Sequence, residues 1–102
     1  MSSNIHTGHC SCGLVSIKVS GPLRPIVYCH CSQCRRQTGH YLAATACDDG
    51  LLEIDGVENI NWYQSSDVAK RAFCSNCGSG LFWKHKDATY TSILAGLFDE
   101  PN

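Results

Sequence analysis

The chain has 102 residues, eight of which are cysteine, and a formal net charge of −1. This length suits one domain, and the longest apolar runs, 42–44 and 93–95, are far shorter than the roughly 18 residues that a membrane-spanning helix needs. The first ten residues lack the basic and apolar regions of a secretory signal. We therefore expect a single domain over residues 1–102, located in the cytoplasm and without a membrane partner.

The first predicted element is a strand. Apolar and polar side chains alternate over residues 14–20, so that Val15, Ile17 and Val19 share one face. Gly21 and the proline after it end the alternation, because this pair is typical of turns. A half-buried strand is the expected structure of this segment.

The rest of the chain continues in the same manner. A short apolar run covers 25–28, and small apolar residues predict a buried strand over 41–47. Further segments with strand character, each bounded by turn residues, lie at 51–55, 60–64, 70–73, 81–83 and 89–94. Only 35–38 and 65–69 have helical character, and both are about one turn long. The sequence therefore predicts a mainly β fold.

The cysteines form three groups and one singleton. They are Cys10-x-Cys12, Cys29-x-Cys31-x-x-Cys34, Cys74-x-x-Cys77, and Cys47 alone. Such short spacings let neighbouring sulfurs converge on one tetrahedral Zn²⁺, whereas the two cysteines of a C-x-C pair are poorly placed to form a disulfide. A cytoplasmic chain also keeps its thiols reduced. We therefore expect zinc sites.

Counting ligands separates two kinds of zinc site. A closed structural site takes four ligands, and the two outer pairs supply them: Cys10, Cys12, Cys74 and Cys77. The triplet Cys29, Cys31 and Cys34 has one ligand fewer, which is the usual form of a catalytic site with an open position. The prediction is two Zn²⁺ ions per chain.

An alternative leaves no open position. If Cys47 or a histidine supplies the fourth ligand of the triplet, both sites are closed. The chain is then a non-enzymatic, zinc-stapled module that binds another protein. Cys47 also lies in an apolar segment, where a buried free cysteine is common.

The charge of the chain limits the classes of molecule that it can bind. Seven thiolates and two zinc ions make the net charge more negative by about three units, which disfavours nucleic acid as a partner. Arg35 and Arg36 directly follow the triplet. Arg35 could contact a carboxylate of an anionic small ligand, or both arginines could lie in solvent.

Three segments resemble a known family in order and spacing. They are Gly8-His-Cys-Ser-Cys-Gly13, Cys29-His-Cys-Ser-Gln-Cys-Arg-Arg-Gln-Thr-Gly39 and Phe73-Cys-Ser-Asn-Cys-Gly-Ser79. Together they resemble the signature of the glutathione-dependent formaldehyde-activating enzyme (Gfa) family, which also includes centromere protein V-like proteins. The resemblance runs from Gly8 to about Gly96.

The resemblance implies a zinc-containing β-tent fold, related to Rab-binding zinc accessory proteins. It implies that Cys10, Cys12, Cys74 and Cys77 hold a structural zinc and that Cys29, Cys31 and Cys34 hold a catalytic one. It also implies a carbon–sulfur lyase whose partners are glutathione, as the thiol, and formaldehyde, as the small aldehyde. The product of their addition is S-hydroxymethylglutathione.

Overall fold

The computed structural model describes residues 5–99, which form two antiparallel sheets. The smaller sheet has the order β1-β2-β5 and contains β1 (Ile5–His9), β2 (Ser16–Ser20) and β5 (Leu52–Asp55). The larger sheet has the order β3-β4-β9-β8-β7-β6 and contains β3 (Val27–Cys29), β4 (Leu42–Asp48), β6 (Ile60–Gln64), β7 (Ala69–Cys74), β8 (Gly80–His85) and β9 (Tyr90–Leu94).

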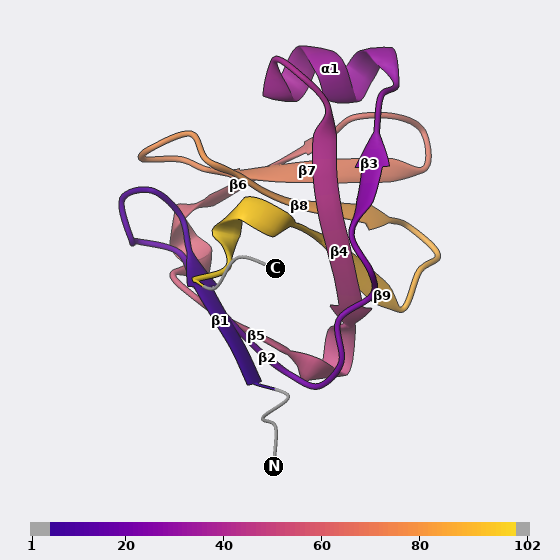
Figure 1. Ribbon diagram of the computed structural model, residues 1–102. Coiled ribbons are helices and arrows are strands. Elements are labelled where there is room, and N and C mark those ends of the chain that lie inside the picture. The colour runs from indigo at the N-terminus through magenta and orange to yellow at the C-terminus, as the bar shows by residue number, and fades with distance from the viewer. Residues whose placement is uncertain (1–4, 100–102) are drawn as a thin grey trace.

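Short helical segments occupy some of the connections. The α-helix α1 (Ser32–Thr38) joins β3 to β4, and three 3₁₀ turns complete the described chain: η1 (Asp49–Leu51), η2 (Val57–Asn59) and η3 (Ala95–Leu97). Figure 1 shows α1 at the top of the molecule and the smaller sheet at the lower left. In this view β7 and β8 lie between them. Within residues 5–99, no helix is long and apolar enough to cross a membrane.

Buried side chains from both sheets form the main core. Ile17 and Val19 on β2 are buried while Lys18 between them is exposed, as the alternation predicts. They pack with Leu81, Phe82 and other side chains of the larger sheet. Three cysteines, Cys10, Cys47 and Cys74, belong to this core, and Cys10 and Cys74 are almost completely buried.

A smaller apolar cluster lies beside α1. It consists of Cys34, Leu42 and Ala44, with Cys29 and Leu94 packed against it. The main core therefore contains one cysteine of each outer pair, and the smaller cluster contains cysteines of the triplet. The outer pairs and the triplet are anchored in different parts of the fold.

The prediction of a mainly β fold is confirmed. Each predicted strand is present with shifts of one or two residues at its ends, and the helical turn expected at 35–38 is the second half of α1. The prediction of helical character at 65–69 is wrong. These residues connect β6 to β7, and the N–H groups of Ser65 and Ser66 both donate to the carbonyl of Ala69.

One strand has no counterpart in the sequence prediction. β1 has the sequence IHTGH, and its buried position is Gly8, so that no apolar alternation marks it. It becomes a strand because its five residues pair with β2, from Ile5 opposite Ser20 to His9 opposite Ser16. This pairing matters for the site, since Cys10 follows β1 directly.

Candidate metal centres

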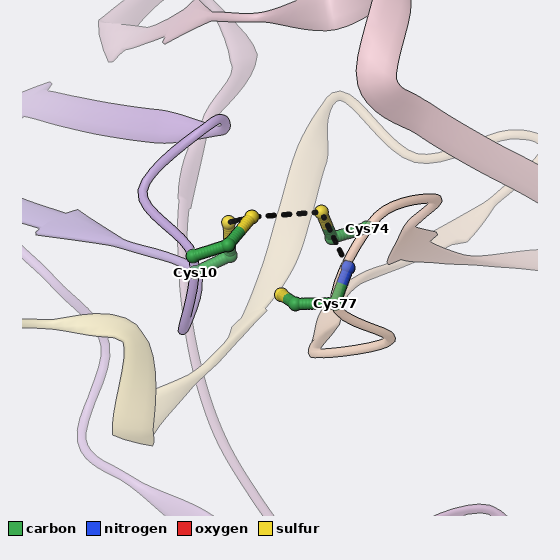
Figure 2. A group of neighbouring side chains, drawn as sticks. Cys10, Cys74 and Cys77 are labelled. Carbon is green, nitrogen blue, oxygen red and sulfur yellow. Dashed lines mark hydrogen bonds between the residues drawn. The ribbon is translucent and has the colours of Figure 1, made fainter.

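Four cysteine sulfurs from distant segments meet where β1 and β7 end. Cys10 and Cys12 follow β1, Cys74 is the last residue of β7, and Cys77 lies in the turn before β8. Their Sγ atoms all lie within 4.8 Å of one another, and we name these residues the four-cysteine group. Figure 2 shows Cys10 on one loop and Cys74 and Cys77 on the facing loop.

Two similar turns present these sulfurs. The N–H of Gly13 donates to the carbonyl of Cys10 at 3.0 Å, and the N–H of Gly78 donates to that of Cys74 at 2.9 Å. Both glycines have a positive φ, of 81° and 80°, which side chains of L-residues rarely allow. A glycine after the second cysteine of each pair therefore closes each turn.

Ser79 connects the two turns. Its Oγ accepts a hydrogen bond from the N–H of Ser11 at 3.0 Å and lies 3.2 Å from the Sγ of Cys77. The hydrogen bond from Ser79 lowers the pKa of Cys77 to about 5, because it stabilises the thiolate. The sequence analysis assigned no role to Ser79, and its place after the C-x-x-C-G motif is the only local signal.

The sulfur spacing tests whether zinc fits this group. A tetrahedral ion with Zn–S bonds of about 2.3 Å places neighbouring sulfurs about 3.8 Å apart. The Sγ of Cys12 lies 3.6 Å from that of Cys10 and 3.7 Å from that of Cys74. All eight cysteines are free of disulfides. The donor set and its geometry therefore fit a closed four-thiolate site.

A second set of sulfurs, the three-cysteine group, lies at the start of α1. Cys29 ends β3, Cys31 precedes the helix and Cys34 lies in its first turn, and their Sγ atoms lie within 4.8 Å of one another. Among residues 5–99, no histidine, aspartate, glutamate or further cysteine joins them at this distance. Three donors fit a metal site that keeps one position open.

The thiols of this group differ in their affinity for a proton. The backbone N–H of Cys34 donates to the Sγ of Cys31 at 3.3 Å and lowers the pKa of Cys31 to about 7. Burial raises the pKa of Cys34 to about 11, although a neighbouring guanidinium opposes this effect. Cys31 is exposed, whereas Cys34 is buried in the small apolar cluster. The group therefore spans from the protein interior to solvent.

A cavity of about 370 Å³ opens beside the three-cysteine group. It is lined by all three cysteines and by Arg24, Val27, Gln33, Leu42, Ala44, Ser66, Arg71, Trp83, Tyr90 and Ser92. These lining residues, all within the described part of the chain, include two arginines and no acidic side chain. The cavity therefore suits a small ligand that carries negative charge.

Arg71 joins the cavity to the three-cysteine group. It lies on β7, is only 3% exposed, and its Nη2 donates to the Sγ of Cys34 at 3.3 Å. Nη1 donates to the Oε1 of Gln37 at 2.7 Å, and Nη2 also donates to the Oε1 of Gln33 at 3.2 Å. The sequence analysis missed Arg71, because a basic residue in a predicted strand gives no sign of burial.

Comparison with known proteins identifies the family. The model of the family described as glutathione-dependent formaldehyde-activating enzyme (GFA) matches residues 5–102, which is nearly the whole chain. The chain belongs to the GFA family. The resemblance carried by the three cysteine motifs is thereby confirmed.

Two proteins similar to this GFA-family chain extend the comparison, one by its sequence and one by its crystal structure. A Schizosaccharomyces pombe protein described as an uncharacterized lyase is 30% identical over 80 residues, which cover 78% of this chain and 58% of the yeast protein. The crystal structure of a Rhodobacter sphaeroides protein superposes with a TM-score of 0.79 at 27% identity, covering 94% of this chain and 90% of that one. The fold is therefore shared with a solved structure, and the chain spans little more than half of the yeast relative.

The other candidate residues of this GFA-family chain neither join a cysteine group nor line the cavity. Arg35 lies exposed on α1 and does not line the cavity. Cys47 is buried in the main core and belongs to neither cysteine group. His30 is exposed and its ring lies 4.9 Å from that of Tyr41. The geometry therefore gives no support to a closed site completed by Cys47 or by a histidine among residues 5–99.

Proposed function

We propose that this GFA-family protein is a zinc-dependent carbon–sulfur lyase that acts on the adduct of glutathione and formaldehyde. In this proposal the four-cysteine group holds a structural zinc, and the three-cysteine group holds a catalytic zinc with an open fourth position. Membership of the GFA family and the lyase description of the yeast relative support the reaction class.

The observation that carries the proposal is the contrast between the two cysteine groups. One has four sulfurs in a closed arrangement, and the other has three sulfurs beside a cavity of about 370 Å³. This volume falls in the range of small-molecule sites, about 300–1,000 Å³. A ligand in the cavity would therefore lie next to an incomplete coordination shell.

The reaction joins the glutathione sulfur to the formaldehyde carbon. The new S–C bond forms as the C=O π bond breaks, and the proton of the thiol ends on the oxygen, which gives S-hydroxymethylglutathione. Zinc held by three thiolates would supply a position for the substrate sulfur and lower the pKa of its thiol. The reverse of the same steps releases formaldehyde.

The chain's own residues would bind and orient the two reactants. Arg24 lies exposed at the cavity and could pair with a carboxylate of glutathione. Hydroxyl groups of Ser66, Tyr90 and Ser92 line the same space and could donate to the oxygen that receives the proton. The apolar side chains of Val27 and Leu42 would exclude water from part of the cavity.

Cobalt substitution tests the open position. We expect the absorption spectrum of the cobalt(II) protein to change when glutathione is added, because its thiolate enters the fourth position. S-methylglutathione has the same carboxylates and a blocked sulfur, so it should leave the spectrum unchanged. The Cys31→Ser variant should lose the response to glutathione. A wild-type spectrum that stays the same in millimolar glutathione would overturn the proposal.

An exchange measurement by nuclear magnetic resonance tests the reaction itself. The zinc protein should accelerate the interconversion of glutathione plus formaldehyde with S-hydroxymethylglutathione above its spontaneous rate. Cys31→Ser should remove this acceleration. A protein that binds glutathione through cobalt but leaves the exchange rate unchanged would be a thiol-binding protein and not a lyase.

A further inference from the structure

Arg71 is a buried cation without a carboxylate partner. Its side chain is 3% exposed, and in the described part of the chain the ion pairs involve other residues, His9 with Asp99 and Lys84 with Asp49. Its Nε is buried and has no hydrogen-bond partner. Burying an unpaired guanidinium is strongly unfavourable, so a compensating negative charge must lie close by.

The nearest source of that charge is the sulfur of Cys34, 3.3 Å from Nη2. The two other contacts of the guanidinium are neutral amide oxygens, those of Gln33 and Gln37. These amides orient the planar group toward the sulfur without neutralising it. The positive charge of Arg71 therefore acts on the three-cysteine group and on the cavity that this group lines.

Formal charges show what this arrangement achieves. Three thiolates around one divalent cation leave a net charge of about −1, which repels an anionic fourth ligand. A guanidinium in contact with one of the sulfurs brings the total close to zero. A hydrogen bond to a coordinating sulfur also reduces the electron density that this sulfur gives to the metal.

We propose that Arg71 is the internal counter-cation of the three-cysteine group and that, acting through Cys34, it makes the fourth position accept anionic ligands such as a thiolate. Arg71 is in this sense a positioning residue. The inference rests on the proposed function, because it requires a metal with an open position in this group.

The test uses two small ligands of different charge. Azide is a monoanion and imidazole is neutral, and the binding of each to the cobalt(II) protein can be followed by absorption. We expect the wild-type protein to bind both. Arg71→Met should weaken azide binding by about tenfold or more, since removal of an opposite charge at 4–6 Å costs one or more powers of ten. Imidazole binding should change by less than about threefold.

A second variant keeps the arginine and cancels its charge. Gln37 accepts from Nη1 at 2.7 Å, so Gln37→Glu places a carboxylate against the guanidinium with almost no change in shape. We expect weaker azide binding, unchanged imidazole binding and a melting temperature at least as high as that of the wild type. This variant keeps the test decisive if Arg71→Met does not fold.

Matched controls show whether the effect on azide binding depends on the charge at Arg71 or on the net charge of the protein. Lys70→Met removes one positive charge from the neighbouring, exposed position of β7, and Asn61→Asp adds one negative charge at an exposed position of β6. Both should bind azide like the wild type. Arg71→Lys keeps a positive charge without the planar fork and should restore most of the azide affinity.

The outcomes distinguish the two proposals. A wild-type protein that binds neither ligand would overturn the open position, and the role of Arg71 with it. A wild-type protein that binds both, with Arg71→Met and Gln37→Glu losing neither ligand or losing both equally, would overturn the role of Arg71 alone. Selective loss of azide in both variants would support it.

Discussion

The sulfur of Cys12 lies 3.7 Å from the sulfur of Cys74, although 62 residues separate them in the sequence. Cys12 belongs to the turn after β1 in the smaller sheet, and Cys74 ends β7 in the larger one. The four-cysteine group therefore joins the two sheets at one point. Several consequences of this connection, and of the separate three-cysteine group, can be measured.

The first prediction concerns Cys12→Ser. Structural zinc contributes about 10–16 kcal/mol to the folding of zinc-finger peptides, which is as large as the total stability of most small domains, about 5–15 kcal/mol. We expect this variant to lose the metal of the four-cysteine group and to be largely unfolded at room temperature. Circular dichroism and metal analysis check this. A variant with the wild-type melting temperature would contradict the role of the group as a staple.

The second prediction concerns Cys31→Ser, which removes one donor of the three-cysteine group. The fold should survive, because the four-cysteine group still connects the sheets. We expect about two metal ions per chain in the wild type and about one in this variant. The melting temperature should fall far less than in Cys12→Ser. Global unfolding of this variant would show that both groups are needed for the fold.

The third prediction concerns Cys47→Ala. Cys47 is 5% exposed, packs in the main core and lies in neither cysteine group. Removing its sulfur leaves a small cavity, so we expect a loss of about 1 kcal/mol in the free energy of unfolding and no loss of metal. Denaturant titration and metal analysis are the measurements. The loss of one metal ion would mean that Cys47 does complete a site.

The fourth prediction concerns Ser79→Ala. The Oγ of Ser79 contacts the N–H of Ser11 and the sulfur of Cys77. Without it, both groups lose a partner, and we expect the free energy of unfolding to fall by about 1–3 kcal/mol. Ser75→Ala makes the same change at an exposed position of the same turn and serves as the control. Equal effects of the two substitutions would argue against the link.

The fifth prediction concerns pH. Hydrogen bonds from Lys84, and then from Thr91, lower the pKa of Asp49 below its usual value. Its contribution to stability is therefore present above the unfolded-state pKa and is lost as pH falls through the lower, folded-state pKa. Asp49 is 45% exposed, so solvent screening limits this contribution to about 1 kcal/mol or less.

Asp49→Asn tests this dependence. The variant should be less stable than the wild type near neutral pH, and the difference should shrink as the solution becomes acidic. Urea titrations over a series of pH values measure it. Asp48→Asn, the same change at the preceding exposed position, provides the comparison. A difference that grows toward acid pH would reverse the sign that we assign to Asp49.

Local patterns in the chain were sufficient for eight of the nine described strands, all except β1, and for the cysteine groups. Apolar side chains recur at every second position where a strand is half buried, as at Ile17 and Val19. The sulfurs of a C-x-C or C-x-x-C pair lie on one turn, so their spacing along the chain already implies a shared ligand. Counting the cysteines by this spacing predicts one set of four and one of three, and the structure gathers the sulfurs in the same two sets.

Contacts between distant segments could not be obtained in this way. Adjacency in the sequence favoured Arg35, one residue after Cys34, as the arginine of the site, but Arg35 lies exposed on α1. The packing of α1 against β7 instead brings Arg71, 37 residues away, against the sulfur of Cys34. The order of strands in the sheet and the packing of α1 against it set such a contact, and side-chain alternation within one strand carries no information about which elements become its neighbours.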